Sequence, residues 1–268
     1  MKAFVILVIL AVAGCSQSTQ NPSPSTLGST TTGLSTTTTE GASTTTTAST
    51  TTTTAPTTTT SSAGGTLSIL FVGNSHTSTH DIPRTVRELL DSDPARQTTV
   101  ELMSAGFLRI AANDVAITDA IGSGDWDIVV LQGQEISQSH SIAYSQEEAV
   151  ALAELAIESG ARALLFSEWP RKGIDETEYI ENIYDEIAEA SGAEVVPVGR
   201  TWDLYLADLP DNNLWASDGN HSNSDGAFLA AATIAHIIAG PDASLTTDTA
   251  HEHFLRTARL TVESYLAG

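Results

Sequence analysis

The feature that most constrains the fold is the alternation of short apolar runs with helix-like segments in residues 66–268. The apolar runs predict five strands, at 67–72, 98–104, 126–131, 161–166 and 194–198. The third run is apolar throughout, which is typical of a strand covered on both faces. Strands that alternate with helices predict an α/β domain of three layers, α/β/α, around a five-stranded parallel sheet.

The helix-like segments have recognisable starts and ends. The first follows Asp81, a residue that suits an N-cap, and has Pro83 in its first turn. The most apolar segment, 227–239, is closed by Gly240 and Pro241. Further helices are expected near 109–121 and at 147–158, around 180–187 and around 254–265.

The start of the chain predicts an export signal rather than part of the fold. Lys2 is followed by a short apolar run, 3–13, and then by Gly14 and Cys15. The run is too short to span a bilayer stably. Residues 12–15 resemble a bacterial lipobox, which implies cleavage after residue 14, lipidation of Cys15 and anchoring to the cell membrane outside the cytoplasm. The alternative is a plain secretory signal with an incidental cysteine.

Residues 16–65 have a composition unlike the rest of the chain. They contain 22 Thr and 10 Ser, and Glu40 is their only charged residue. Such a segment cannot bury enough apolar surface to offset its ordering entropy, so we predict a disordered stalk over 15–65. Its composition is like that of glycosylated stalks. The predicted organisation is thus a signal peptide (1–14), a stalk (15–65) and a catalytic domain (66–268).

Charge and cysteine content exclude several classes of protein. The formal net charge is −22, which excludes a general nucleic-acid binder and argues against anionic lipid headgroups as partners. Cys15 is the single cysteine, so neither a disulfide framework nor a cysteine zinc cluster can form within the chain.

Two motifs lie on loops where an α/β domain binds ligands, beyond the carboxyl ends of its strands. The first is Gly73-Asn74-Ser75-His76-Thr77, directly after the first strand. A serine on a tight turn between strand and helix exposes its hydroxyl, although most such turns are only turns. We expect His76 to help shape a pocket beside the serine.

The second motif is Asp218-Gly219-Asn220-His221, just before the most apolar helix. An Asp and a His three residues apart on one loop can hydrogen-bond to each other. The carboxylate then fixes the imidazole tautomer and leaves the other ring nitrogen for a serine hydroxyl. An exposed polar turn that caps a helix is the alternative for this motif alone.

Together, the two motifs resemble those of the SGNH hydrolase superfamily, the GDSL-like esterases and lipases. The resemblance covers about residues 66–240 and includes the start of the helix after the histidine, 225–231. It implies a flavodoxin-like SGNH hydrolase fold and a catalytic triad with Ser75 as nucleophile, His221 as base and Asp218 as the acid that orients the base. It also implies that no metal or cofactor is required.

The resemblance further implies an oxyanion hole, to which Ser75 and Gly106 would each contribute a backbone N–H. The third donor in the family is an asparagine after strand three, but this chain has Leu131-Gln132-Gly133-Gln134 there. Glutamine carries the same amide on a stem one carbon longer. Alignment of the strand ends favours Gln134 as the donor, with Gln132 as its rival.

The resulting hypothesis is an extracytoplasmic serine esterase that acts on O-acyl esters, with acetyl groups on carbohydrate as the favoured substrate. Trp169 follows strand four and Trp215 precedes Asp218, so both are candidates for binding a sugar ring, although core packing is an equal alternative. A catalytically inactive binding or adhesion lipoprotein and an acyltransferase with the same triad remain alternatives, since a fold alone does not decide function.

Overall fold

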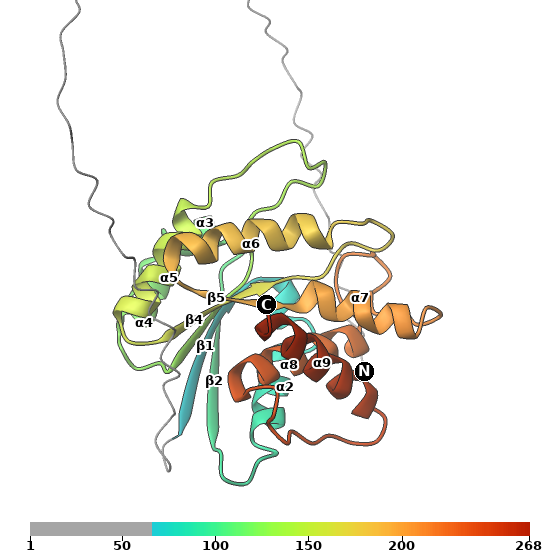
Figure 1. The fold of residues 1–268 in the computed structure, drawn as a ribbon. Coiled ribbons are helices and arrows are strands. Elements are labelled where there is room, and N and C mark those ends of the chain that lie inside the picture. The colour runs from blue at the N-terminus through green and yellow to red at the C-terminus, as the bar shows by residue number, and fades with distance from the viewer. Residues whose placement is uncertain (1–65) are drawn as a thin grey trace, which may run out of the picture. The chain divides into compact units, whose positions relative to one another are not determined.

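A five-stranded parallel sheet forms the centre of the computed structural model, which describes residues 66–268 (Figure 1). The strand order is β2-β1-β3-β4-β5. The strands are β1 (Leu67–Gly73), β2 (Thr98–Ser104), β3 (Ile128–Leu131), β4 (Arg162–Ser167) and β5 (Glu194–Pro197). The chain leaves β1 for an edge strand and later returns to its other side, so the order reverses between β1 and β3. In open α/β sheets, ligands bind at such a switch point.

Helices cover both faces of the sheet. Helices α3 to α6 pack on one face, and α2, α7, α8 and α9 pack on the other (Figure 1). The helices of the described residues are α1 (Ser75–Ser78), α2 (Ile82–Leu90), α3 (Leu108–Ala111), α4 (Val115–Gly122), α5 (Glu147–Glu158), α6 (Thr177–Ser191), α7 (Val198–Asp208), α8 (Ser224–Ala239) and α9 (Glu252–Leu266). The predicted three-layer α/β/α architecture with five parallel strands is confirmed.

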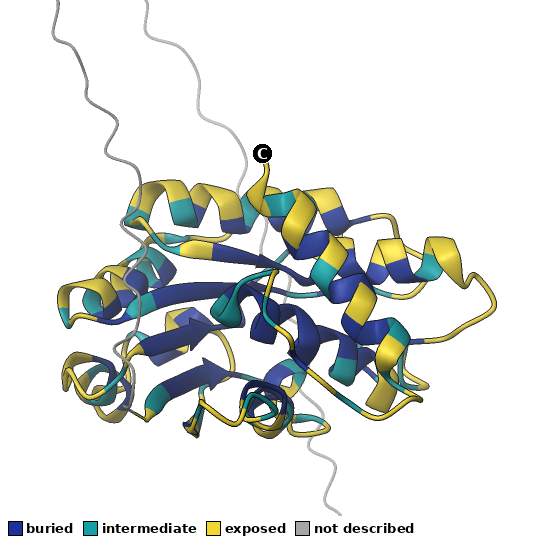
Figure 2. Cartoon of the chain, turned by 60° about the horizontal axis from the view of Figure 1, so that its bottom comes forward, coloured by how far each residue is buried: buried dark blue, intermediate teal, exposed yellow. Residues whose placement is uncertain are grey.

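Successive strand residues supply two separate cores. In β1, Ile69 and Phe71 face the core beneath α2, α8 and α9, whereas Leu70 and Val72 face the core beneath α3 to α6. All four side chains are fully buried. Figure 2 shows the central strands as mostly buried and the outer sides of the helices as exposed. This two-sided burial is why the strand runs read as continuously apolar.

Several element boundaries differ from the sequence-based prediction. The helix expected near 109–121 is two helices, α3 and α4, because Asp114 begins a new helix by accepting a hydrogen bond from the N–H of Ala116 at 2.9 Å. The third strand begins at Ile128 rather than at Trp126. The sequence analysis missed α7, whose buried Trp202 and Tyr205 join the larger core.

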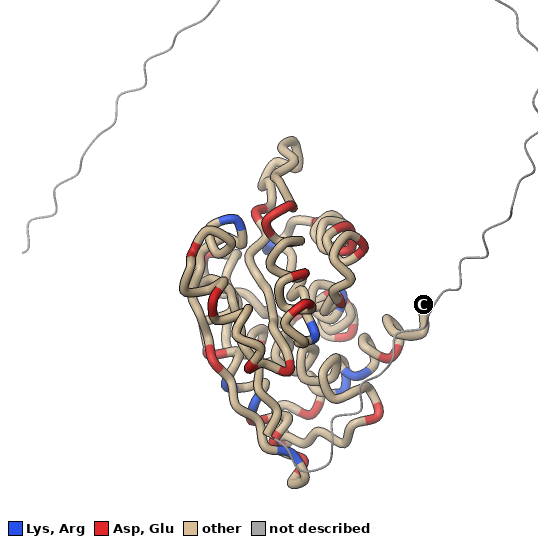
Figure 3. The backbone as a smooth tube through the Cα atoms, turned by 90° about the vertical axis from the view of Figure 1, so that its left-hand side faces the viewer, with Lys and Arg blue, Asp and Glu red and all other residues tan. Residues whose placement is uncertain are grey.

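Acidic residues are spread along the backbone of several elements of the domain, with few basic residues between them (Figure 3). Lys2 and Glu40 are the only charged residues before residue 66, so the described part carries the whole net charge of −22. None of its helices is both long enough and apolar enough to cross a membrane. The predicted signal peptide, Cys15 and the Thr-rich stalk lie outside the described residues.

Candidate active site

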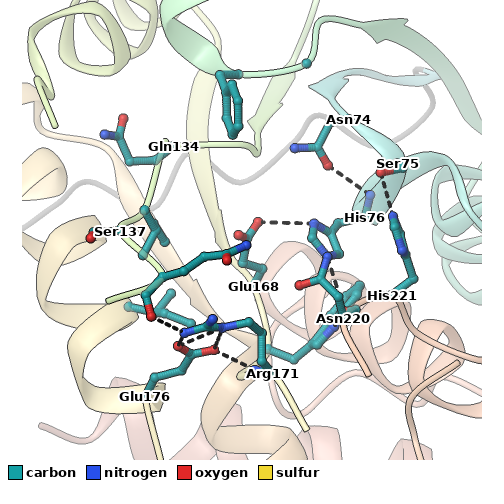
Figure 4. A pocket seen from close by; sticks show the side chains of 16 residues that line it. Asn74, Ser75, His76, Gln134, Ser137, Glu168, Arg171, Glu176, Asn220 and His221 are labelled. Atoms are coloured by element: carbon teal, nitrogen blue, oxygen red, sulfur yellow. Dashed lines mark hydrogen bonds and ion pairs between the residues drawn. The ribbon is translucent and has the colours of Figure 1, made fainter. Parts of the chain in front are cut away.

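The structure brings Ser75, His221 and Asp218 together in a hydrogen-bonded row, of which Figure 4 shows Ser75 and His221. The Oγ of Ser75 lies 2.8 Å from Nε2 of His221. The other ring nitrogen, Nδ1, lies 2.6 Å from Oδ2 of Asp218. A base between a hydroxyl and an orienting carboxylate, all within hydrogen-bond distance, is the geometry that activates a serine nucleophile.

The loop that carries Asp218 and His221 is ordered by its own carboxylate. Oδ1 of Asp218 accepts hydrogen bonds from the backbone N–H groups of Asn220, at 2.9 Å, and of His221, at 3.0 Å. The hydrogen bond to the His221 ring, assisted by these two, lowers the pKa of Asp218 to about 2. The carboxylate therefore stays charged at neutral pH, as its orienting role requires.

The turn that presents Ser75 is braced by a buried glutamine. Oε1 of Gln132 accepts from the N–H of Asn74 at 3.0 Å and from the hydroxyl of Thr77 at 2.9 Å, and its Nε2 donates to Glu168. Gln132 is only 1% exposed. Its amide thus joins the end of β3 to the nucleophile turn and to the residue after β4.

A pocket of about 380 Å³ opens beside the row. It is lined by Asn74, Ser75, His76, Gly106, Phe107, Gln134, Ile136, Ser137, Gln138, Glu168, Trp169, Arg171, Glu176, Ile180, Asn220 and His221. The lining includes both polar and apolar side chains, which suits an organic substrate that has both kinds of surface.

Across the pocket from Ser75, a buried ion pair holds the wall in place (Figure 4). Nη2 of Arg171 donates to Oε2 of Glu176 at 2.6 Å and to the carbonyl of Gln138 at 2.9 Å. His140 reaches the same Glu176 oxygen at 3.2 Å. Burial raises the pKa of Glu176, but the hydrogen bonds from Arg171 and His140 outweigh it, so the pKa lies below its ordinary value. The pair fastens the 132–146 loop to the start of α6.

The predicted oxyanion donors differ in whether they already have a hydrogen-bond partner. Gly106 lines the pocket with φ +67°, and its N–H, like that of Ser75, donates to no other group of residues 66–268. Gln134 also lines the pocket, but its Nε2 donates to the carbonyl of Ser145 at 3.0 Å and to that of Glu135 at 3.3 Å. Figure 4 shows that this amide lies well away from Ser75. The oxyanion roles of Gln134 and Gln132 stay predictions, with both amides already engaged.

Of the two candidate tryptophans, only Trp169 lines the pocket. Trp169 is nevertheless only 3% exposed and stacks on Trp202 with ring centroids 4.7 Å apart. Its Nε1 donates to the carbonyl of Asn220 at 2.8 Å and so holds the His221 loop. Trp215 is not among the lining residues; it packs edge-on against Trp202 and donates to the carbonyl of Pro170. The structure thus does not bring Trp215 to the pocket.

His76 lines the pocket and lies against the row of Ser75, His221 and Asp218. Its ring stacks on that of His221, with centroids 5.0 Å apart and an angle of 28° between the planes. The ring of Trp169 makes a T-shaped contact with that of His76, with centroids 5.1 Å apart. Nδ1 of His76 lies 3.8 Å from a carboxylate oxygen of Glu168. This packing restricts the ring of His221 to the plane in which it meets Ser75.

Sequence reasoning missed Glu168, Arg171 and Glu176. Glu168 directly follows β4, so its place at the carboxyl end of a central strand was a usable signal. Arg171 and Glu176 offered none, because only the folded loop brings them to the pocket. No group of three or more His, Cys, Asp or Glu side chains in residues 66–268 is placed to hold a metal ion.

The fold and the site define a class: a doubly wound α/β domain with a Ser-His-Asp row at its topological switch point. Comparison with solved structures gives the particular fold, that of the SGNH hydrolases. A candidate SGNH hydrolase from Slackia heliotrinireducens superposes with a TM-score of 0.50 at 24% identity, over 65% of this chain and 100% of its own.

Two further structures share the fold. A DUF4886 family protein from Bacteroides uniformis has a TM-score of 0.58 at 13% identity, over 76% of this chain and 95% of its own. A mutant acetyl-xylooligosaccharide esterase from Geobacillus has a TM-score of 0.51 at 15% identity, over 69% of this chain and 99% of its own. No family model and no curated protein matches the sequence. The resemblance to the SGNH hydrolases, as far as it concerns the fold, is confirmed.

Proposed function

We propose that residues 66–268 form a serine esterase that cleaves O-acyl esters through an acyl-enzyme intermediate. The observation that carries this proposal is the hydrogen-bonded row Ser75–His221–Asp218 at the mouth of the pocket. A serine exposed on a turn, a base at 2.8 Å and an ionised carboxylate behind the base are the parts that acyl transfer needs.

In the proposed reaction, Ser75 Oγ attacks the ester carbonyl while His221 Nε2 takes its proton. The tetrahedral intermediate carries its negative charge on the former carbonyl oxygen, where the N–H groups of Ser75 and Gly106 can donate to it. The imidazolium then protonates the leaving alcohol as the C–O bond breaks. A water molecule, deprotonated by His221, then attacks the acyl-serine; as the acyl C–O bond breaks, His221 returns the proton to Ser75 Oγ and the carboxylic acid leaves.

The favoured substrate is an acetyl ester on a carbohydrate. Support comes from the acetyl-xylooligosaccharide esterase that shares the fold, and from a pocket that offers hydrogen-bonding groups beside apolar walls. The direct test is hydrolysis of p-nitrophenyl acetate by the wild type and by Ser75→Ala, followed by acetyl release from an acetylated xylooligosaccharide. Added alcohol acceptors would reveal an acyltransferase. Failure of the wild type to cleave any ester would favour a binding protein.

We also propose that Cys15 carries a lipid that anchors the domain at the cell membrane, outside the cytoplasm. The support is the lipobox-like sequence before the single cysteine. Multiple acyl chains give stable anchoring. Cys15→Ser should release the protein into the medium or block its processing, with the specific activity unchanged. A variant that is processed and stays membrane-bound would contradict this proposal.

A further inference from the structure

The side-chain amide of Asn74, the residue before Ser75, is a polar group of the pocket to which the assignments above give no role. Its Oδ1 accepts from the backbone N–H of His76 at 2.9 Å. This bond fixes the orientation of the amide, because the atom that accepts from the N–H must be the oxygen Oδ1 and not the nitrogen Nδ2. Nδ2 therefore occupies the other side, and Figure 4 shows it directed toward the middle of the pocket. Nδ2 donates to no group of the described residues.

The surroundings of this amide keep the space around it open. Gly133 has φ +106°, and a Cβ placed there would lie 3.0 Å from Nδ2 of Asn74 and 2.8 Å from the carbonyl oxygen of Gly106. A side chain at 133 would thus push apart Asn74 and the 106 loop. The hydroxyl oxygen of Tyr184 accepts hydrogen bonds from the N–H groups of Gly133, at 3.4 Å, and Gln134, at 3.3 Å. These bonds hold the backbone at 133–134 next to the amide of Asn74.

Three donors that have no partner among residues 66–268 thus belong to residues lining one pocket: the N–H of Ser75, the N–H of Gly106 and the amide of Asn74. The two glutamine amides are committed elsewhere, that of Gln132 to Glu168 and that of Gln134 to backbone carbonyls. Donors that are fixed in place and have no partner in the resting protein are what a developing oxyanion requires, because they need no reorganisation during the reaction.

On the basis of the proposed esterase function, we infer that Asn74 Nδ2 is the side-chain donor of the oxyanion hole. One asparagine then has two duties: Oδ1 fixes the nucleophile turn, and Nδ2 stabilises the charge that the nucleophile creates. Asn74 is thereby a catalytic residue, because its amide touches the reacting oxygen in the transition state. It is also held within one residue of Ser75 by the chain itself.

The test separates the two duties by substitutions that keep an acceptor for the N–H of His76 and remove the amide NH₂ group that reaches the pocket. Asn74→Ser retains a hydroxyl that caps the turn, and Asn74→Asp retains the shape and the acceptor oxygen. We expect Asn74→Ser to lower kcat by about 10²–10³-fold, with KM changed by less than about threefold. Asn74→Asp should lose more, because its charge repels the oxyanion. Both variants should melt within a few degrees of the wild type.

A second readout responds only to a donor. A thionoester places sulfur, a weak hydrogen-bond acceptor, where the oxyanion would form. The wild type should therefore prefer the oxygen ester, and Asn74→Ser should reduce this preference about tenfold. Asp114→Ser is the matched control. Asp114 caps α4 by accepting from the N–H of Ala116, two residues later, as Asn74 accepts from the N–H of His76, but Asp114 lies outside the pocket. This variant should alter neither kcat nor the preference.

Two results for Asn74→Ser would overturn the inference: a kcat within about threefold of the wild type, or a lowered kcat with an unchanged preference for the oxygen ester. It would also be overturned if Gln134→Ala lost more kcat and more of this preference than Asn74→Ser. Inactivity of Ser75→Ala in the same assay keeps these results separate from failure of the esterase proposal. If Ser75→Ala retained its activity, the proposed function and the oxyanion role would fall together.

Discussion

Two histidine–carboxylate pairs border the pocket and differ in what surrounds them. Asp218 pairs with His221 beside Ser75, and its side chain is 49% exposed. Glu176 pairs with His140 across the pocket, and its side chain is 3% exposed. The pKa of Asp218 is low because of its hydrogen bonds, with almost no burial to oppose them. The pKa of Glu176 is low in spite of burial, since hydrogen bonds from Arg171 and His140, together with the charge of Arg171, outweigh the burial.

The difference shows that a histidine–carboxylate pair is not by itself a catalytic unit. In the first pair, the second ring nitrogen of the histidine reaches a serine hydroxyl at 2.8 Å. In the second pair, the histidine stacks on Tyr179 at 4.1 Å, and the carboxylate is occupied by Arg171. In the proposed reaction, the first pair is the one that moves a proton. The second pair is saturated, meaning that its carboxylate is already bonded to Arg171 and His140, and it fastens the 132–146 loop. Each prediction below tests this division of roles.

The largest effect is expected at the nucleophile. Ser75→Ala and His221→Ala should each lower kcat on p-nitrophenyl acetate by about 10⁴-fold or more, since each removes a member of a unit that works as a whole. The double variant should be hardly slower than either single variant. Circular dichroism and melting should match the wild type, because Ser75 lies on the surface. Retained activity in Ser75→Ala would show that the row is not the catalytic centre.

The next effect concerns the first pair. Asp218→Asn should lower kcat by about 10⁴-fold, because an amide cannot hold the required tautomer of His221 or stabilise its charged form. Stability should change little, since the side chain is exposed. With a pKa of about 2, the carboxylate stays ionised across any practical assay range, so its protonation should not contribute an acid limb to the pH–rate profile. Kinetics and melting measured on the same sample would check both statements.

The saturated pair should affect stability rather than chemistry. Glu176→Gln leaves Arg171 without its counter-charge and should lower the free energy of unfolding by about 2 kcal/mol at neutral pH. Because the folded pKa of Glu176 is depressed, its contribution is present above about pH 4.3 and is lost as the pH falls through the folded value. The stability gap between wild type and variant should therefore narrow in acid.

Urea unfolding at several pH values would measure this gap. A gap that stays constant with pH, or a kcat loss as large as that of Asp218→Asn, would break the distinction between the two pairs. The loss of kcat on a small ester is expected to be far smaller than the loss in Asp218→Asn.

The smallest effect is expected at Trp169. Trp169→Phe removes the donor to the carbonyl of Asn220 and should lower kcat about tenfold by loosening the His221 loop. Trp215→Phe is the matched control: it loses an equal 2.8 Å bond, to Pro170, outside the pocket, and should keep kcat near the wild-type value. Equal losses in both variants would point to packing alone. A raised KM for an acetylated saccharide only in Trp169→Ala would support sugar contact.

The sequence by itself determined the parallel sheet and the order of its motifs, because burial on two faces and helical spacing are written in neighbouring residues. The grouping of Ser75 with Asp218 and His221 came from the resemblance of the two motifs to those of the SGNH hydrolases, because each motif alone is also consistent with an ordinary turn. Helix α7 was missed because its buried positions depend on packing against α8 and α9.

Only the tertiary structure decided how the amides of the site are used. The same functional group, an amide, is carried by Gln132, Gln134 and Asn74. Nothing in their local sequence distinguishes an amide that is engaged in internal hydrogen bonds from one that is free to donate. The distinction comes from partners far along the chain: Glu168 for Gln132, Ser145 for Gln134, and the open space at Gly133 for Asn74. Whether an amide is free to donate depends on what else the fold brings within 3 Å or so of it, and a single sequence does not contain those distances.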